Sequence, residues 1–369
     1  MPMPIDRSVR QDESAPAWSR RHLLRTAGAM GAAALGGPLL AACSDNSGDS
    51  KGSSSTDHVR VALGWLKDVE FAGFFVADSA GYYADEKLSI QFQAGGPNTP
   101  DTTAVLATGQ ADIGVHANMQ VLLQATAKGN DFVMVGSGYQ TNPGGLISLA
   151  SNPVRSAKDL VGAKVLGQQG AKPQLNAVFE LAGLKPDYEF IPVGFDIDPL
   201  VEKQGKVFTG YMTTQPITLE SKYKMKQGKD FLTLTYESFG MPAYATLVYC
   251  KRSFLQQRKD VMERFMRATI RGWQDNAKDP ERAARLVVEK YGADLGLDLK
   301  QQIRSNEIGI PFMESALTRK KGLFRMDVER LAGPMYKGLR AAGVKDLPDA
   351  HKVVDTSVLD AVYRGSNRV

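Results

Sequence analysis

Cysteine and histidine are scarce in this sequence, and each scarcity excludes a class of site. The 369 residues contain only two cysteines, Cys43 and Cys250, and four scattered histidines. If Cys43 is used as a lipid attachment point, as argued below, Cys250 is the only cysteine of the folded part. An intramolecular disulfide and a cysteine-based metal site are then impossible, and four isolated histidines offer no obvious ligand set for iron. We expect no metal and no cofactor, and we expect Cys250 to be a buried core thiol.

Strong charge and catalytic motifs are also lacking. The net charge of +5 falls to +3 without residues 1–42, which implies no strong attraction to nucleic acid or to a membrane surface. The sequence contains no G-x-x-x-x-G-K-[ST] phosphate loop and no G-x-S-x-G nucleophile motif. We therefore expect neither a nucleic-acid partner nor phosphate-loop or serine-hydrolase chemistry.

The N-terminus carries export signals rather than a fold. Residues 19–24, S-R-R-H-L-L, resemble a twin-arginine motif, and the apolar run 26–42 is too short and too weakly apolar for a permanent span. Leu40-Ala41-Ala42-Cys43 resembles a lipobox, so we expect residues 1–43 to be a signal and Cys43 to be lipidated. The alternative is an N-terminal anchor that is retained intact. Residues 44–58, rich in Gly, Ser and Asp, predict a flexible tether.

The folded part is organised around residues 59–115. Alternating apolar residues predict strands at 59–63, 88–92 and 111–115, with helical spacing at 71–80 and 104–107. This β-α-β-α-β order is typical of a parallel sheet with crossover helices, whose ligands bind beyond the carboxyl ends of the strands. The candidate residues there are Trp65, Asp68, Glu70, Phe71, Asn98, His116 and Asn118.

A second βα series follows after a helix at 119–127, a strand at 132–135, a Gly-rich loop at 136–145 and a strand at 146–149. We expect strands at 164–166, 189–193 and 207–211, a helix at 173–181, and return strands at 231–235 and 245–248. The C-terminal pattern predicts helices at 259–278, 280–291, 305–312, 328–343 and 357–363. Candidate site residues beside these elements are Tyr139, Gln168, Tyr211, Thr213, Gln215 and Tyr244. The turn that holds Gln168 either offers N–H groups to a ligand or is simply a tight βα turn.

Three motifs connect the chain to a known family. Trp65 after the first strand, G-Y-Y at 81–83 and G-Q-A-D-I-G at 109–114 together resemble the thiamine-pyrimidine-synthase-like family of solute-binding proteins. This resemblance implies a type II periplasmic-binding-protein α/β fold, with two βα lobes around a hinged cleft and an α-rich C-terminal part. We expect lobe one at 59–150, lobe two at 151–244, and a return to lobe one at 245–369.

The same resemblance implies a receptor of an ABC importer. Its partners would be a small ligand and the permease, and the chain would be a monomer held by its lipid on the outer face of the cytoplasmic membrane or in the periplasm. The fungal relatives that the chain also resembles are enzymes that make the thiamine pyrimidine. Their histidine position falls on Phe71 and their cysteine cluster on residues 241–245, where this chain has neither residue type. A pyrimidine-metabolising enzyme and a lipoprotein serving only as an interaction module remain the alternatives.

The charges of the candidate site residues distinguish between the possible classes of ligand. Trp65 offers a flat face for a planar ring, while Asp68 and Glu70 would repel an anion and favour an amino-substituted or protonated ring. An aminopyrimidine related to thiamine is therefore the first expectation, a flavin the second, and an organosulfonate or nitrate-type anion the third. Each residue also has a plainer interpretation. Trp65 can be packing, Asp68 and Glu70 a solvated loop or a helix cap, and His116 a hydrogen-bonding or stacking group rather than a base.

Overall fold

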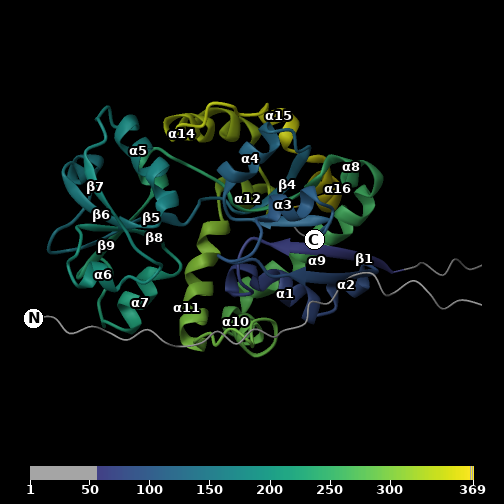
Figure 1. Cartoon of the computed structure of the whole chain (residues 1–369). Coiled ribbons are helices and arrows are strands. Elements are labelled where there is room, and N and C mark those ends of the chain that lie inside the picture. The colour runs from purple at the N-terminus through teal and green to yellow at the C-terminus, as the bar shows by residue number, and fades with distance from the viewer. Residues whose placement is uncertain (1–55, 366, 368) are drawn as a thin grey trace, which may run out of the picture. The chain divides into compact units, whose positions relative to one another are not determined.

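The computed structural model describes residues 56–365, 367 and 369. They form two five-stranded sheets, each covered by helices (Figure 1). The expected signal at 1–43 with Cys43, and most of the expected tether, lie outside the described residues. In the part of the chain that the structure describes, no helix is both long enough and apolar enough to cross a membrane.

The first sheet has the strand order β2-β1-β3-β10-β4. Its strands are β1 (Asp57–Leu63), β2 (Leu88–Gln93), β3 (Ile113–His116), β4 (Phe132–Tyr139) and β10 (Ala245–Lys251). β1 pairs in parallel with β2 and β3, whereas β10 lies antiparallel between β3 and β4. The predicted β-α-β-α-β opening is confirmed, with α1 (Ala72–Ser79), α2 (Tyr82–Asp85) and α3 (Thr102–Ala107) as the connecting helices.

Local chemistry explains where these helices begin. Gly81, at φ 79°, turns the chain between α1 and α2, a left-handed conformation that suits glycine. Asp101 caps α3 by accepting a hydrogen bond from the Thr103 N–H. Asn118 caps α4 (Met119–Ala127) in the same way. Asn118 lies just beyond the end of β3, so its cap also sets the direction in which the chain leaves the sheet.

The second sheet has the order β7-β6-β8-β5-β9. Its strands are β5 (Gly144–Leu149), β6 (Ala163–Gly167), β7 (Tyr188–Pro192), β8 (Val207–Tyr211) and β9 (Phe231–Thr235). β6 is parallel to β7 and β8, and β5 is antiparallel to β8 and β9. Its helices are α5 (Lys172–Leu181), α6 (Asp198–Val201) and α7 (Gln215–Ser221).

The segment 136–149 differs from the sequence expectation in two ways. β4 continues to Tyr139 where a Gly-rich loop was expected, because its glycines are used for close packing. A Cβ at Gly136 would lie 3.0 Å from Phe324, and one at Gly138 would lie 3.2 Å from Thr246. The following strand, expected in lobe one, pairs with β8 and β9 and so belongs to the second sheet.

The chain therefore crosses between the sheets at two places, residues 140–143 and residues 236–244. A hydrogen bond of 2.9 Å from the Asn142 N–H to the Ala243 carbonyl joins the two crossings. Hinge closure around them stays a prediction.

The C-terminal part is helical, as expected. The helices are α8 (Arg252–Gln257), α9 (Lys259–Lys278), α10 (Pro280–Leu286) with a helical turn to Tyr291, α11 (Leu299–Gly309), α12 (Ala316–Lys321), α13 (Val328–Arg330), α14 (Tyr336–Ala341), α15 (Ala350–Val353) and α16 (Ser357–Tyr363). Helices α8, α9, α15 and α16 contact strands of the first sheet, whereas α14 contacts α5 and α11 contacts α7. The C-terminal part thus contacts elements of both lobes, which the sequence did not suggest.

Each sheet has a buried apolar cluster on both of its faces. Cys250 lies in one of them with no exposed surface, which confirms the expected core thiol. Burial, together with the charge of Asp355, raises the pKa of this thiol to about 12, so it is protonated and unreactive at neutral pH.

Helices α1 and α9 approach each other through two glycines, and this contact is testable. A Cβ at Gly272 would lie 2.1 Å from the Gly73 carbonyl oxygen. We expect Gly272→Ala to destabilise the protein by about 1–3 kcal/mol through overpacking, measured by urea unfolding. The control Gly333→Ala has open space around its Cβ and lies on the surface before Pro334, so we expect it to change the stability by no more than about 0.5 kcal/mol. Equal effects of the two variants would contradict this packing.

Candidate ligand-binding site

A cavity of about 550 Å³ lies where loops of the two sheets meet. The carboxyl ends of β1, β3, β6, β7 and β8 border it, as do both crossings, α11 and α14. Ten residues singled out from the sequence line it: Trp65, Asp68, Glu70, His116, Asn118, Tyr139, Gln168, Tyr211, Thr213 and Gln215. The strand-end rule therefore located one shared cavity from residues that lie far apart in the chain.

Three other candidates do not line the cavity. Phe71 is 1% exposed in the core under α1, because a short helical turn at Val69–Phe71 directs it inward. Tyr244 is fully buried, and its hydroxyl accepts a hydrogen bond of 2.8 Å from the Asp327 N–H. Asn98 is exposed on the loop after β2, the edge strand of the first sheet. The structure assigns the first two to packing and the third to the surface.

Among residues 56–365, Asp68 and Glu70 are the only acidic side chains of the cavity wall, and no lysine or arginine of this part lines it. Asp68 accepts a hydrogen bond of 2.9 Å from the Glu70 N–H, so the helix-cap interpretation is correct for Asp68, although its carboxylate also borders the cavity. The Thr246 hydroxyl lies 3.4 Å from Glu70 Oε1. Thr246 has φ 53°, a costly conformation for a β-branched residue, at the start of β10.

Burial controls the protonation of this carboxylate pair. It raises the pKa of both side chains, and the charge of Asp68 raises the pKa of Glu70 further, against the opposing hydrogen bond from Thr246. Since no cation lines the cavity, the pair is stabilised either by keeping a proton or by a positively charged group that enters from outside.

Two tyrosines extend this acidic region. Burial, followed by the charge of Glu70, raises the pKa of both Tyr139 and Tyr211 far above neutrality. Both phenols therefore remain neutral groups that can donate hydrogen bonds. The Tyr211 backbone N–H donates a bond of 2.7 Å to the Gln215 side chain, which fixes the turn at the end of β8.

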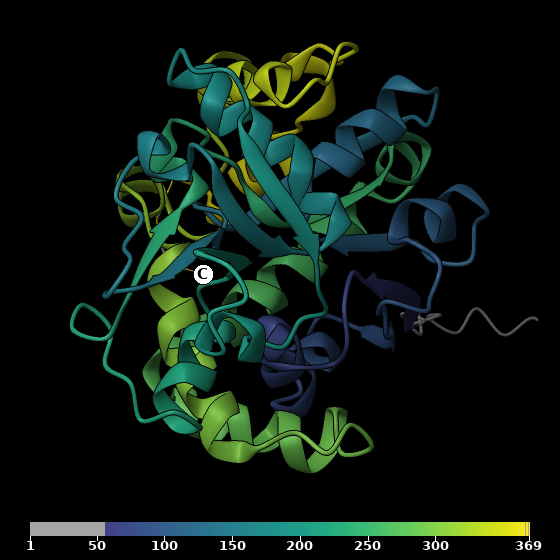
Figure 2. The same ribbon diagram turned by 60° about the vertical axis from the view of Figure 1, so that its left-hand side comes forward.

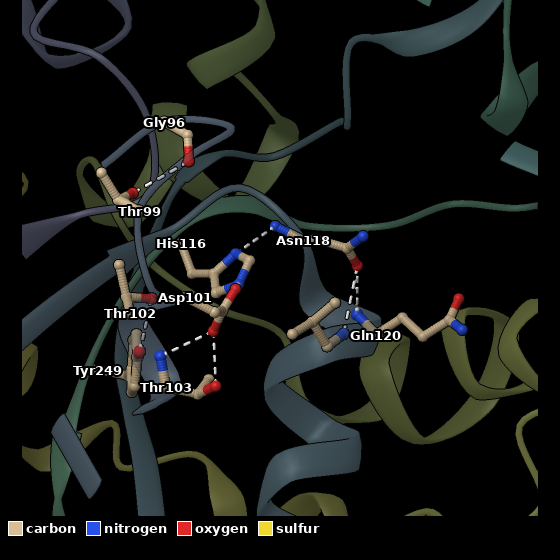
Figure 3. A network of polar contacts seen from close by, with 10 residues as sticks. Gly96, Thr99, Asp101, Thr102, Thr103, His116, Asn118, Gln120 and Tyr249 are labelled. Atoms are coloured by element: carbon tan, nitrogen blue, oxygen red, sulfur yellow. Dashed lines mark hydrogen bonds and ion pairs between the residues drawn. The ribbon is translucent and has the colours of Figure 1, made fainter. Parts of the chain in front are cut away.

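His116 is held by the chain at both ring nitrogens, as Figure 3 shows. Nδ1 accepts a hydrogen bond of 2.9 Å from the Asn118 N–H, and Nε2 lies 2.9 Å from Asp101 Oδ2. Burial would raise the pKa of Asp101, but the hydrogen bond and charge of His116 lower it below its usual value. With both nitrogens occupied, His116 can offer a ligand only its ring face and edges, and it ties the loop before α3 to the start of α4.

An aromatic pair connects the two sides of the cavity. The rings of Trp65 and Phe195 meet edge to face, with centroids 5.6 Å apart. Trp65 follows β1, and Phe195 follows β7 in the other sheet, where it is 54% exposed. Sequence reasoning missed Phe195, although its place just past a strand end could have identified it.

Three residues of the cavity wall each have a polar side-chain atom without a hydrogen-bond partner among the described residues. These atoms are Gln174 Oε1, Thr209 Oγ1 and the Tyr236 hydroxyl. Each of them is itself buried, so none is exposed to a ligand in the cavity. Sequence analysis did not find them, because Thr209 lies within a strand and Gln174 within a helix. Among the described residues, no group of three or more His, Cys, Asp or Glu side chains is arranged to hold a metal ion.

Comparisons with known proteins agree with this geometry. Residues 68–283 match the family model described as NMT1/THI5 like. The chain is 26% identical to a 4-amino-5-hydroxymethyl-2-methylpyrimidine phosphate synthase of Legionella pneumophila, over 64% of the chain and 75% of the relative. It is 26% identical to a riboflavin-binding protein of Chloroflexus aurantiacus, over 79% and 82%. It is 25% identical to a formylaminopyrimidine-binding protein of Halalkalibacterium halodurans, over 74% and 81%.

Solved structures share the fold. The periplasmic aliphatic sulphonate binding protein of Escherichia coli aligns with a TM-score of 0.60 at 15% identity, covering 83% of this chain and 99% of that one. The two-lobed periplasmic-binding-protein fold expected from the sequence is confirmed.

The acidic pair predicts a pH-dependent stability. The folded ligand-free protein holds the Glu70 proton more tightly than the unfolded chain does, because burial raises its pKa. The free energy of unfolding therefore falls as pH rises between the usual pKa of a glutamate and the raised pKa of Glu70, by about 1.4 kcal/mol per pH unit. Glu70→Gln should remove this loss, so that it is more stable than wild type at neutral and alkaline pH and no different in acid.

Thermal unfolding followed by circular dichroism across that pH range measures the difference. Glu180→Gln, on the exposed face of α5, is the matched control and should follow wild type throughout. A constant offset of Glu70→Gln at every pH would show that Glu70 does not hold its proton more tightly in the folded protein.

Proposed function

Because the chain belongs to the NMT1/THI5-like family and has the periplasmic-binding-protein fold, we propose that it is the solute-binding receptor of an ABC importer. It captures a small nitrogen heterocycle, neutral or cationic, between its two sheets and delivers it to a permease. The observation that carries this proposal is a two-sided cavity with two carboxylates and no lysine or arginine in its wall.

The charge of the cavity selects among ligand classes. An anion placed here would face Asp68 and Glu70 with no cation to compensate it, and desolvation would make that repulsion strong. An amino-substituted ring instead donates hydrogen bonds to the carboxylates, and a protonated ring also supplies the positive charge that the buried pair lacks. The sulphonate ligand named for the Escherichia coli neighbour is therefore disfavoured here, although the fold is shared.

An aminopyrimidine related to thiamine is the leading ligand, and a flavin is the second. Both are flat nitrogen heterocycles, and relatives of this chain carry the names of a formylaminopyrimidine-binding protein and of a riboflavin-binding protein. Trp65 and Phe195 place aromatic surface at the edge of the cavity, where it can cover a planar ring.

An enzymatic role is the alternative, because another relative is named as a pyrimidine phosphate synthase. The position that the fungal enzymes fill with histidine is Phe71, which is buried away from the cavity. The positions of their cysteines run from Met241 to Ala245, where this chain has none. The chain thus lacks the reactive groups that the resemblance assigns to catalysis, which supports binding without turnover.

The N-terminal motifs complete the proposal. Export through the twin-arginine motif and lipidation at Cys43 would hold a monomeric receptor on the outer face of the cytoplasmic membrane or in the periplasm. The tether at 44–58 would then let the folded part reach the permease.

Ligand binding is tested with a small panel of compounds. We expect 4-amino-5-hydroxymethyl-2-methylpyrimidine or riboflavin to raise the melting temperature without being consumed, since a ligand at 100 times Kd adds about 2.7 kcal/mol. Ethanesulfonate should have no effect. Trp65→Ala should weaken binding by about 10- to 100-fold, measured by calorimetry, through lost aromatic contact area.

Tyr223→Ala, a half-buried aromatic outside the cavity, is the control and should bind like wild type. Stabilisation by ethanesulfonate alone would overturn the ligand class, and product formation from the pyrimidine would replace the receptor with an enzyme.

Lipidation is tested separately in cells. Cys43→Ser should abolish incorporation of labelled fatty acid and move the protein from the membrane to the soluble fraction. Cys250→Ser keeps the attachment site and serves as the control. Equal labelling of wild type and Cys43→Ser would contradict the lipid anchor.

A further inference from the structure

Phe195 differs from nearly all other large apolar side chains in its exposure. Among the residues that the structure describes, only Val161 and Phe195 are large apolar side chains with high exposure, at 49% and 54%. Val161 lies outside the cavity wall, whereas Phe195 borders the cavity beside Trp65. A single exposed apolar side chain is ordinary, so the contacts that hold Phe195 decide what it does.

Two glutamine side chains hold the loop that carries Phe195. Gln168, directly after β6, donates a hydrogen bond of 2.7 Å from Nε2 to the Gly194 carbonyl. Gln215, at the start of α7, donates one of 3.1 Å to the Phe195 carbonyl and accepts one of 2.7 Å from the Tyr211 N–H. Two successive carbonyls of the loop are thus bonded to neighbouring elements. The backbone of Phe195 is therefore held in place although its ring is exposed.

The ring of Phe195 reaches across to the other lobe. It meets Trp65 edge to face, with the ring planes at 67° and the centroids 5.6 Å apart. Trp65 also packs against a buried apolar cluster of the first sheet, so it belongs to the first lobe. Aromatic rings in this geometry attract each other beyond the burial of their surface. The contact therefore favours the arrangement in which the rims of the two lobes meet.

The strand order places this contact away from the two crossings. The crossings connect β4 and β10 with β5 and β9, whereas Phe195 follows β7 at the opposite edge of the second sheet. At a strand spacing of about 4.8 Å, β7 is about 14 Å from β5. Trp65 follows β1, two strands from β10. A swing of the lobes about the crossings therefore moves these two loops more than it moves residues beside the crossings.

Helices of the C-terminal part border the cavity on two other sides. In Figure 1, α14 lies at the top of the molecule and α11 below it, and Figure 2 shows the same order from another direction. Residues of both helices line the cavity, and α14 contacts α5 while α11 contacts α7. The crossings form a third side of the wall. The loops that hold Trp65 and Phe195 form the side away from the crossings.

We propose that Phe195 and Trp65 form a gate through which the ligand enters and leaves the cavity, and that Gln168 and Gln215 position Phe195 in it. This inference rests on the proposed receptor function and adds the control of ligand exchange. Because the two rings contact each other directly, they must separate before a ligand passes in either direction. The same contact forms in the closed protein with and without ligand, so it affects the rates of exchange more than the equilibrium affinity.

Exchange kinetics test the gate. In a Trp18→Phe background, stopped-flow mixing with riboflavin or 4-amino-5-hydroxymethyl-2-methylpyrimidine is followed by the fluorescence of Trp65, because Trp273 is only 2% exposed. We expect Phe195→Ala to raise the association and dissociation rate constants by about 3- to 10-fold, as loss of an aromatic pair implies, and to change Kd by less than about threefold. Phe195→Tyr keeps the ring and should retain the wild-type rates. Val161→Ala, at the other exposed apolar side chain, is the control and should also match wild type.

The positioning role is tested with Gln168→Met, which keeps the length of the side chain but cannot donate to the loop. We expect both rate constants to rise by about 2- to 3-fold, because one hydrogen bond to the loop is lost. In the ligand-free protein, acrylamide should quench Trp65 more strongly, since Phe195 covers it for less of the time. Gln204→Met removes a side-chain hydrogen bond at an exposed position of the same lobe and should match wild type.

The outcomes separate the gate from the receptor function. Binding by wild type with unchanged rates in Phe195→Ala overturns the gate and leaves the receptor function intact. Faster dissociation alone, with an equal rise in Kd, makes Phe195 a ligand contact and also overturns the gate. If wild type binds neither compound, the proposed ligand class fails and the quenching measurement decides about the gate. Stronger quenching in Gln168→Met then supports the gate, and quenching equal to wild type overturns it.

Discussion

The pairing of Tyr139 with Ala245, at the end of β4 and the start of β10, determines where the second sheet joins the first. The chain leaves the first sheet at one of these residues and returns at the other, so the whole second lobe is inserted between two neighbouring strands. Both crossings are consequently adjacent. Tyr139 itself lines the cavity, which places the attachment point of the two sheets in the cavity wall.

This attachment explains why the acidic pair is where it is. Glu70 comes from the loop after β1, and its carboxylate reaches the Thr246 hydroxyl at the start of β10, directly after the return crossing. Removing water from this junction disfavours the charged forms of Asp68 and Glu70, and the nearby phenols carry no positive charge. Under the proposed function, a ligand with a positive or donor edge would compensate these two carboxylates, which would link ligand binding to the stability of the ligand-free protein.

Much of this arrangement could be predicted from the sequence, and the failures have physical causes. Strand periodicity and the strand-end rule identified both sheets and brought Trp65, Glu70 and Tyr211 to one cavity. Phe71 was misplaced because position in a loop does not reveal that a helical turn rotates the side chain into the core. The glycines of β4 predicted a loop, because their use in close packing depends on Thr246 and Phe324, which are distant in sequence.

The wall contributed by α14 had no sequence signal at all. Met335 and Leu339 follow ordinary helical spacing, and only the tertiary structure brings them beside α5 and the return crossing. Contacts of this kind are decided by how the last third of the chain folds back over both sheets, and local pattern carries no information about them.

The hydrogen bond between Asn142 and Ala243 joins the two crossings, and this limits the ways in which the two lobes can move relative to each other. A single connection between two rigid lobes allows rotation about several axes, whereas two short connections that lie side by side restrict the rotation to one axis. Twisting would stretch one connection and compress the other, so we expect the low-energy motion to be a swing about the line across them. In the proposed receptor, the rims of the two lobes would then separate or meet along one arc, and the distance between them would report whether a ligand is bound.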